Sequence, residues 1–357
     1  MRIKSVALII LFLLSISGCA LRPADLGGTE LSNRLLIDAV GLDRDAANEV
    51  TLTLQTLRLS RSGGEDGPHG AATLTFTAAS VAEAVARAAD RTGLTPFFAC
   101  ARVLVLGKAA ADGGVLTLLD YFIRNRSVRN MVPVCVSKTT AKTLLNAQTN
   151  GDESAGAVIE RALTAEEGGG TGGGTPFFRF VSLLRSADTC ARCPIVGTET
   201  TDGVTHFFTA GDAVFEEDRA RFTLEEDSAR ILRLLNGELK ETALTCRSPY
   251  FTLHLRRIRR KIRFGKDGAV DLWITAEAAA PREPLGELYP ADKAAEEALR
   301  KLAEEFLYDR ARSCIDAVYG RYGADPLRLR KRGRLPDTVP PQTLRIEITA
   351  SLKTTAY

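Results

Sequence analysis

Apolar positions near the N-terminal end of the chain follow the patterns of β-strands. Residues 34–40 form a largely apolar run that ends in Gly41-Leu42-Asp43, which predicts a strand leading into a turn. Residues 49–60 alternate apolar and polar side chains, and the alternation changes phase near Leu57. Such a change is typical of a bulge or of a strand that switches partners. A loop at 61–70 and a short strand at 73–77 follow.

The next segments predict a strand, a helix and a strand in succession. Ser80 and Glu83 have the spacing of a capping box, which predicts a helix through Ala89. A buried strand is then expected at 102–107, a helix at 114–124 and another strand at 131–137. Strands connected in this way usually form a right-handed parallel crossover.

The rest of the chain continues to mix both kinds of element. Seven residues at 168–174 are Gly except for one Thr, and they predict a flexible loop or a link between domains. The other expected elements are a short helix (140–147), a strand (177–185), a hairpin (206–215 with 219–224), a helix (225–235) stopped by Asn236-Gly237, three strands (238–246, 250–264 and 269–278), a long helix (292–319) and a final strand (343–353). The fold class is therefore α+β, multi-domain, with mixed sheets and packed helices and no detectable internal repeat.

The first nineteen residues resemble a bacterial lipoprotein signal. Arg2 and Lys4 form a basic start, residues 6–16 are apolar except for one serine, and Gly18-Cys19 closes the run. The apolar stretch is too short to span a bilayer, which needs roughly 20 residues, but it suits a secretory signal. In a lipobox the thiol takes a diacylglycerol and the peptide is cut before the cysteine. Lipidation of Cys19 is the favoured interpretation, and an ordinary cleaved signal with an incidental cysteine is the alternative.

These observations suggest a domain organisation. Residues 1–18 are the signal peptide and 19–33 a tether. An N-terminal α+β region is expected at 34–200, with two subdomains as an option, and a C-terminal α+β domain at 205–357. No later stretch approaches the length of apolar sequence that spans a membrane. The body is therefore expected outside the cytoplasmic membrane, where chemistry driven by cytosolic ATP is disfavoured.

Composition and charge exclude several protein classes. The chain has 357 residues, 45% hydrophobic and 25% charged, which is ordinary for a globular protein. This excludes a disordered tail protein and a polytopic membrane protein. The formal net charge is +3, and removal of Arg2 and Lys4 with the signal lowers it to +1. A chain so close to neutral has no bulk electrostatic reason to bind nucleic acid.

Several segments form a recognisable series when they are taken together. The most telling stretch is 97–125, with Arg102-Val103-Leu104-Val105-Leu106-Gly107 and Leu119-Asp120-Tyr121-Phe122-Ile123-Arg124. The others are Gly18-Cys19, the strand ending in Gly41-Leu42-Asp43, Ser80-Val81-Ala82-Glu83-Ala84, Gly211-Asp212-Ala213-Val214-Phe215 followed by 224–237, and Asp325-Pro326-Leu327. In their order and spacing these segments resemble the spore germination Ger(x)C family, the lipoprotein C subunits of germinant receptors. The resemblance covers roughly 20–355. The Gly run, the Cys190 and Cys193 pair and a reduced aromatic pattern near Asp325 depart from it.

The resemblance implies a non-catalytic subunit built of mixed α/β domains. It would be anchored through acylated Cys19 on the outer face of the spore inner membrane. Its partners would be polytopic A and B receptor subunits, and it would help nutrients trigger germination. The rival hypothesis is a solute-binding lipoprotein that delivers a small ligand to a transporter; this predicts a deep cleft with convergent polar groups.

Catalytic and metal-binding chemistry finds little support. His69, His206 and His254 have no partner at the spacing of a metal site or a catalytic triad. No nucleophile elbow, zinc-protease motif or phosphate-binding loop occurs in the sequence. No catalytic residue, cofactor or metal is therefore expected.

The cysteines are interpreted as structural. Cys190-Ala191-Arg192-Cys193-Pro194 is half a zinc site at most and is expected in a loop. An oxidised staple or two unpaired thiols are both more plausible than redox activity. The remaining body cysteines are expected in the core: Cys100, Cys135, Cys246 and Cys314.

Two basic clusters occur in the second half. Along 256–263, the isoleucines share one face of the expected strand and most of the basic residues lie on the other face. The second cluster, 328–334, is expected in a loop. The first cluster has no interleaved aromatic residues for stacking bases, and solvated surfaces are the default for both clusters. A secondary hypothesis is that one cluster contacts anionic lipid headgroups.

Overall fold

The computed structural model describes residues 33–57, 72–125, 128–149, 153–164, 173–186, 190–247, 250–266, 268–279, 293–335 and 340–350. The predicted signal peptide at 1–18, Cys19, the loop at 61–70 with His69, and most of the Gly run lie outside these residues. Within them, none of the helices has both the length and the apolar character needed to cross a membrane.

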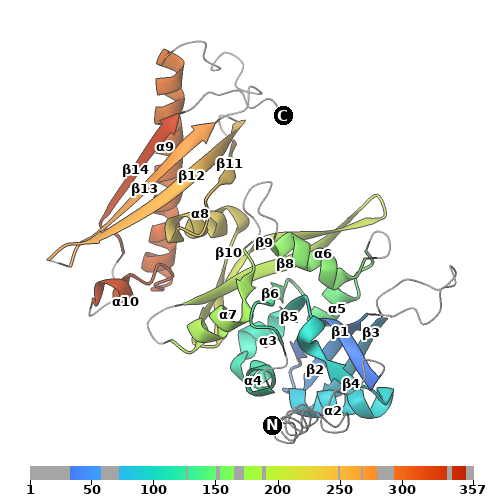
Figure 1. Ribbon diagram of the computed structural model, residues 1–357. Helices are drawn as coiled ribbons and strands as arrows, with labels where there is room; N and C mark the ends of the chain where they lie inside the picture. Colours follow the sequence, from blue (N-terminus) through green and yellow to red (C-terminus); the bar gives the residue numbers. More distant parts are fainter. Residues whose placement is uncertain are drawn as a thin grey trace, which may run out of the picture.

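Two sheets form the framework of the molecule (Figure 1). The strands of the first are β1 (Arg34–Arg44), β2 (Val50–Thr56), β3 (Ala72–Ala78), β4 (Thr95–Phe97), β5 (Val103–Leu106), β6 (Pro133–Ser137), β7 (Thr175–Pro176), β8 (Ala191–Thr201), β9 (Val204–Glu216) and β10 (Arg219–Leu224). This ten-stranded sheet has the order β10-β9-β8-β6-β5-β1-β2-β3, with β4 beside β1 and β7 beside β6. The second sheet has the order of its sequence: β11 (Thr242–Arg247), β12 (Tyr250–Phe264), β13 (Val270–Ala279) and β14 (Thr343–Ala350).

Helices cover these sheets. They are α2 (Val81–Thr92), η3 (Phe98–Cys100), α3 (Lys108–Gly113), α4 (Leu116–Asn125), α5 (Ala141–Leu145), α6 (Ala155–Thr164), α7 (Phe177–Leu184), α8 (Glu226–Asn236), α9 (Lys293–Ile315), the π-helical segment η5 (Asp316–Arg321) and α10 (Leu329–Gly333). The α+β class with two mixed sheets is confirmed.

The centre of the ten-stranded sheet is parallel and buried on both faces. β1, β5, β6 and β8 run parallel to one another, whereas β2 and β9 pair with the two ends of this group in antiparallel. All four side chains of Val103–Leu106 are buried, because α2, α3, α4 and α7 pack on one face and α5 and α6 on the other. The predicted crossover from 102–107 through a helix to 131–137 is confirmed, since β5 and β6 pair in parallel.

Two details of the first strands differ from expectation. β1 does not turn at Gly41-Leu42-Asp43 but continues to Arg44, because all three residues pair with β2. The register shift lies in β1 between Ile37 and Ala39, opposite Thr56 and Gln55. The bulge is therefore centred on Asp38 of β1. The alternation of apolar residues changes phase in the segment that contains β2, which is the partner of β1.

The predicted strand at 177–185 is wrong. It is the helix α7, whose buried side chains are Phe177, Phe180, Val181 and Leu184. This spacing places all four on one helical face. Its three phenylalanines and Val181 favour a strand locally, but packing against β6 and β8 determines the helix.

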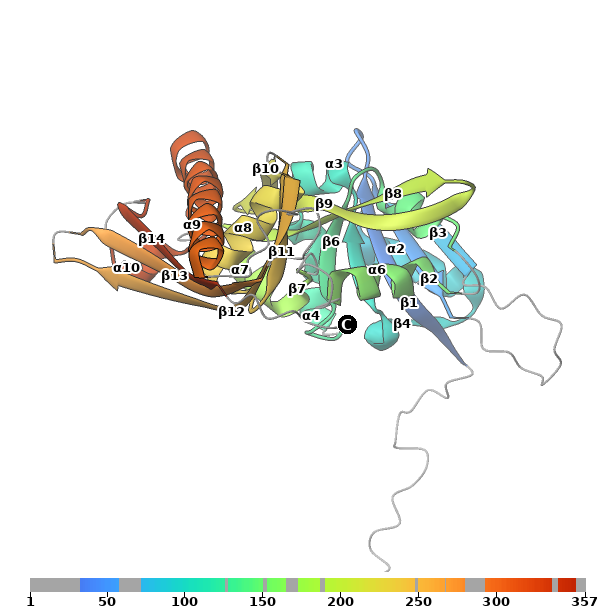
Figure 2. The same ribbon diagram turned by 90° about the horizontal axis from the view of Figure 1, so that it is seen from above.

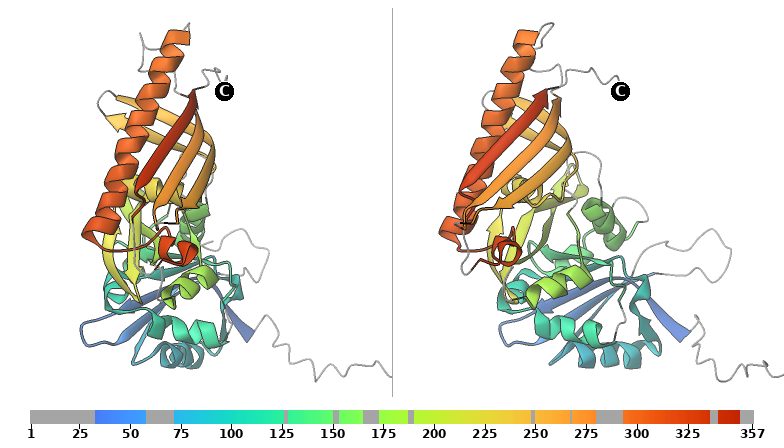
Figure 3. Two further views of the ribbon diagram at one scale, coloured as in Figure 1. Left: turned by 90° about the vertical axis from the view of Figure 1, so that its left-hand side faces the viewer. Right: turned by 60° about the vertical axis from the view of Figure 1, so that its left-hand side comes forward.

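The second sheet has its own hydrophobic core. α9 crosses one face of this sheet, and α8 lies between α9 and the ten-stranded sheet (Figures 1 and 3). The hairpin expected from residue 206 onward forms as β9 and β10, and both strands pair within the first sheet. That sheet therefore extends to Leu224, beyond the expected start of the C-terminal domain at 205. The helix stopped by Asn236-Gly237 and the strands β12 and β13 agree with prediction.

Candidate functional site at the junction of the two sheets

Asp43, in the Gly41-Leu42-Asp43 motif of the family resemblance, caps a helix. Its carboxylate accepts the backbone N–H groups of Ala141 at 2.8 Å and Lys142 at 2.9 Å, at the start of α5. A Cβ at Gly107 would lie 1.8 Å from Asp43 Oδ1, so only glycine leaves room for the carboxylate. Burial raises the pKa of Asp43, and the two backbone hydrogen bonds oppose that rise. Asp43 and Gly107 thus connect the end of β1 to the start of α5.

The later motifs of the resemblance meet where the two sheets join. Gly211 has φ +110°, and a Cβ there would lie 1.8 Å from the carbonyl oxygen of Leu224. The register between β8 and β9 shifts at this point, between Pro194 and Val196. Glycine permits this bulge because other residues cannot adopt the conformation or the close approach. The bulge precedes Asp212, whose side chain is completely buried.

Asp212 is the centre of a network of ion pairs. Arg192 Nη1 lies 2.6 Å from Asp212 Oδ2, and Arg233 pairs with the other carboxylate oxygen. Arg192 also pairs with Glu238, and Arg179 Nη2 lies 3.0 Å from Glu238 Oε1. These residues come from β8, β9, α7, α8 and the segment after α8. The network therefore joins the ten-stranded sheet to α8, the helix that packs against the four-stranded sheet.

The Asp325-Pro326-Leu327 turn lies at the same junction. Asp325 accepts the Tyr319 hydroxyl at 2.7 Å and the backbone N–H groups of Leu329 and Arg330 at 3.0 and 2.9 Å. The carbonyl oxygen of Pro326 accepts Asn236 Nδ2 at 3.2 Å, which ties the turn to the end of α8. Burial and the nearby Asp325 charge raise the pKa of Tyr319.

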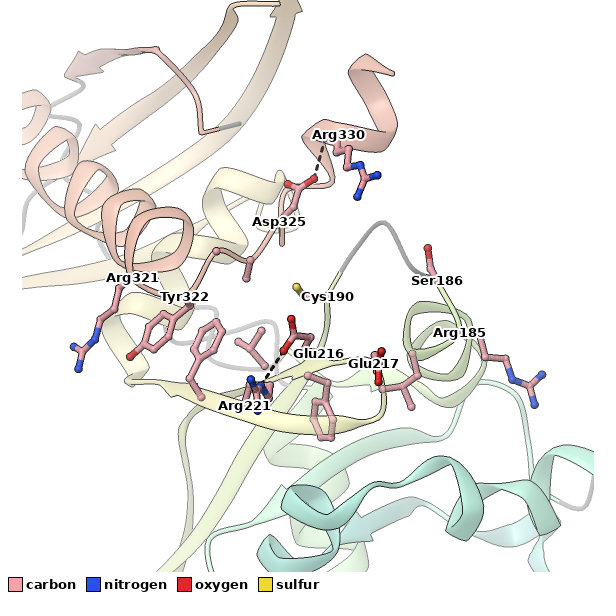
Figure 4. A pocket seen from close by; sticks show the side chains of 16 residues that line it. Arg185, Ser186, Cys190, Glu216, Glu217, Arg221, Arg321, Tyr322, Asp325 and Arg330 are labelled. Atoms are coloured by element: carbon pink, nitrogen blue, oxygen red, sulfur yellow. Dashed lines mark hydrogen bonds and ion pairs between the residues drawn. The ribbon is translucent and has the colours of Figure 1, made fainter. Parts of the chain in front are cut away.

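Two cavities flank this turn, and Cys190 lines both. Their volumes are about 720 and 400 Å³. In the larger one, shown in Figure 4, the rings of Phe222 and Tyr322 stack with centroids 3.8 Å apart. Four arginines are labelled in Figure 4: Arg221 pairs with Glu216 at 2.8 Å, whereas Arg185, Arg321 and Arg330 lie on separate sides of the cavity.

The Cys190 and Cys193 thiols are unpaired. The expectation of a loop is corrected for Cys193, because Cys193 and Pro194 lie within β8. Cys193 packs in a hydrophobic core of the ten-stranded sheet, and Cys190 contacts the core of the four-stranded sheet. Burial raises the pKa of both thiols, so both are protonated at neutral pH and are poor nucleophiles and metal ligands. Of the sequence's two alternatives, the structure shows unpaired thiols.

Other residues considered from the sequence lie apart from one another. His206 is exposed on β9, and His254 is half-buried on β12 in the other sheet. The described residues contain no group of three or more potential metal-binding side chains. The expected burial of Cys135 and Cys314 is confirmed, whereas Cys100 is half-buried. Cys246 lies on β11.

The basic clusters are partly as expected. Residues 256–263 lie on β12, with Ile258 buried, although the register shifts between Arg256 and Arg259. The expected loop at 328–334 is corrected, since residues 329–333 form the short helix α10. Its N-terminal N–H groups bind the Asp325 carboxylate, which stabilises the turn of helix.

The N-terminal half of the chain matches the model of a known protein family. The spore germination protein N-terminal domain matches residues 27–198. Over residues 27–198, the chain therefore belongs to the spore germination protein family, as the Ger(x)C resemblance predicts. The crystal structure of the GerBC protein has the same fold, with a TM-score of 0.50 and 14% sequence identity. The similarity covers 88% of this chain and 97% of that protein, so it includes the second sheet of this Ger(x)C protein. No curated protein sequence matches the chain.

The ion-pair network was not predicted from the sequence. Gly211-Asp212 was recognised as part of the family resemblance, but its buried role was not. Arg192 lies within the Cys-x-x-Cys motif, and that motif indicates thiol chemistry and not a buried cation. A charged residue inside an otherwise apolar strand such as β8 is the signal that could have identified Arg192.

Proposed function

We propose that this Ger(x)C protein is the membrane-anchored, non-catalytic C subunit of a spore germinant receptor. It acts with polytopic A and B subunits in nutrient-triggered germination. The observation that carries the proposal is the family match over residues 27–198, within a fold shared with the GerBC protein. The family motifs in the described residues serve as helix caps, a bulge and a turn, which is consistent with a subunit that acts through its surfaces.

Anchoring through Cys19 places the body at the outer face of the spore inner membrane. Two or three acyl chains suffice for stable attachment, since each buried CH₂ contributes about 0.8 kcal/mol. A tether confines the body to a thin layer above the membrane and raises its effective concentration near integral subunits. Function would then depend on co-localisation as well as on folding.

The Cys19→Ala variant tests the anchor. We expect the variant to leave the spore membrane fraction and to slow germination, while the purified protein keeps its unfolding temperature. Cys100→Ala is a matched control, because it also removes one thiol and Cys100 lies in the folded body. Equal membrane retention and equal germination of Cys19→Ala and wild type would contradict the proposal.

Solute binding is the second candidate function, because the larger cavity could hold a small ligand. Its volume of about 720 Å³ suits a small ligand. Arg221 is paired with Glu216, however, and the other three labelled arginines diverge, whereas a solute site needs polar groups that converge (Figure 4). Neighbouring genes for multi-span membrane subunits would support the receptor, and genes for a permease with an ATPase would support solute delivery.

A further inference from the structure

The four-stranded sheet has one covered face and one open face. The covered face packs against α8 and α9 through Leu255, Leu272, Ile274 and Leu344. The open face carries the side chains that alternate with these along β12, β13 and β14. Its basic residues within the described part of these strands are Arg256, Arg259, Lys261, Arg263 and Arg345. All five are exposed.

Trp273 lies among these cations. It is the one tryptophan of the chain, and it is half-buried on the open face. Arg263 Cζ lies 4.3 Å and Lys261 Nζ 5.7 Å from the ring centroid. A tryptophan flanked by Lys and Arg suits the boundary between water and lipid, where the ring meets the headgroups and the cations meet phosphate.

The acidic side chains of the open face do not balance its basic ones. They are Asp271, Glu277 and Glu347. Arg257, also exposed, lies 2.6 Å from Glu277 and neutralises it. The face therefore keeps an excess of positive charge, and its complement is an anionic surface.

The open face lies on the side of the molecule where β1 begins. Figures 2 and 3 both show the sheet turned away from α9 toward the side where β1 begins. The residues between Cys19 and Arg34 can reach at most about 50 Å. An anchor at Cys19 thus keeps this side within reach of the membrane.

Two exposed apolar side chains lie at the edge where β1 begins. β1, β5 and β6 are parallel, so all three start at this edge, and Met131 precedes β6. The backbone N–H of Phe178 donates to the carbonyl of Asn130, which places Phe178 beside Met131. Their exposed fractions are 66% and 51%. Both can enter the outer part of a bilayer, as apolar residues of peripheral proteins do.

We propose that the open face of the four-stranded sheet, with Met131 and Phe178, docks on an anionic lipid bilayer. The docking rests on the proposed acylation of Cys19, which supplies attachment, and the open face then fixes the orientation of the body. This adds to the proposed function a defined side that faces the lipid and an opposite side, with α9, that is free for protein partners.

The fluorescence of Trp273 tests the docking directly. The full acylated chain is incorporated into vesicles of phosphatidylglycerol or of phosphatidylcholine, each with a dansyl-labelled headgroup lipid. We expect energy transfer from Trp273 to dansyl in phosphatidylglycerol, a marked loss of transfer in phosphatidylcholine, and the same loss in high salt, which screens exposed charges. Flotation of the vesicles measures the anchor separately.

Charge reversal supplies matched variants. The double variant Arg256→Glu with Arg259→Glu changes two open-face residues that lie opposite Glu277 and Thr275 and not opposite Trp273. It should lower the energy transfer in phosphatidylglycerol to the level measured in phosphatidylcholine. Lys301→Glu with Arg312→Glu makes the same change of charge on exposed positions of α9 and should leave transfer intact. Equal transfer in both lipids, or in both double variants, on a chain that floats would overturn the docking and leave the anchor standing. A chain that fails to float would overturn the anchor and the docking together.

Discussion

Arg192 and Asp212 form a buried ion pair between β8 and β9, with 2.6 Å between Nη1 and Oδ2. Asp212 also pairs with Arg233 of α8, so one carboxylate links the ten-stranded sheet to the second half of the molecule. A buried charge that loses its partner is strongly destabilising, because desolvation is no longer compensated. The stability of the junction therefore depends on Asp212.

Asp212→Asn should lower the free energy of unfolding by roughly 3–5 kcal/mol, because Arg192 and Arg233 would face each other without the carboxylate. Urea unfolding measures the change. Glu216→Gln is the control, since Glu216 lies on the same strand and pairs with Arg221 at 2.8 Å, but both side chains are about 65% exposed. Its loss should be below about 1 kcal/mol. Similar losses in the two variants would show that the network does not support the junction.

Gly211→Ala should destabilise the protein more than Gly203→Ala. Both glycines have positive φ, +110° and +79°, so alanine costs roughly 1–2 kcal/mol at either position. At Gly211 the new Cβ would also meet the Leu224 carbonyl at 1.8 Å, whereas at Gly203 nothing lies within 4 Å. Overpacking should add roughly 1–3 kcal/mol at Gly211. Thermal unfolding of the two variants checks this difference, and equal unfolding temperatures would refute it.

Tyr319 should make stability fall at alkaline pH. Burial and Asp325 raise its pKa above the ordinary value of 10.0, so the unfolded chain loses this proton at a lower pH than the folded protein does. The contribution of Tyr319 is complete below about pH 10 and declines above it by about 1.4 kcal/mol per pH unit. Urea unfolding between about pH 10 and pH 11 should show a shallower decline for Tyr319→Phe than for wild type. The buried thiols decline equally in both proteins, so parallel curves would contradict the role of Tyr319.

Oxidation should not join Cys190 to Cys193. The two side chains contact different cores, and burial raises the pKa of both thiols. Mild oxidation of the folded protein followed by peptide mapping should recover both cysteines as thiols. A 190–193 disulfide in the folded protein would restore the alternative of an oxidised staple.

Much of the fold could be predicted because local signals agree with the packing. Asn236-Gly237 ends α8 because Gly237 adopts the left-handed conformation, with φ 68°. The alternation along β12 survives because one face packs against helices and the other stays open. The prediction of a strand at 177–185 is wrong because a short apolar segment rich in phenylalanine suits both a strand and a buried helix.

The junction could not be predicted because its partners are distant in the sequence. Arg192 is 20 residues from Asp212 and 46 from Glu238, and no local pattern connects them. The family resemblance selected Gly211-Asp212 and Asp325-Pro326-Leu327 without showing that both lie at one junction. The bulge requires glycine at position 211, and the cap of α10 requires a carboxylate at position 325, which explains the residue types in the two motifs.

Co-purification tests the central claim, that this chain is the anchored C subunit of a germinant receptor. A chain tagged after Tyr357 is recovered from detergent-solubilised spore membranes, and its partners are identified by mass spectrometry. The account predicts two polytopic subunits in amounts comparable to the chain, together with a diacylated N-terminal peptide that begins at Cys19. Recovery of an unacylated chain alone, or with a permease and its ATPase, would contradict it.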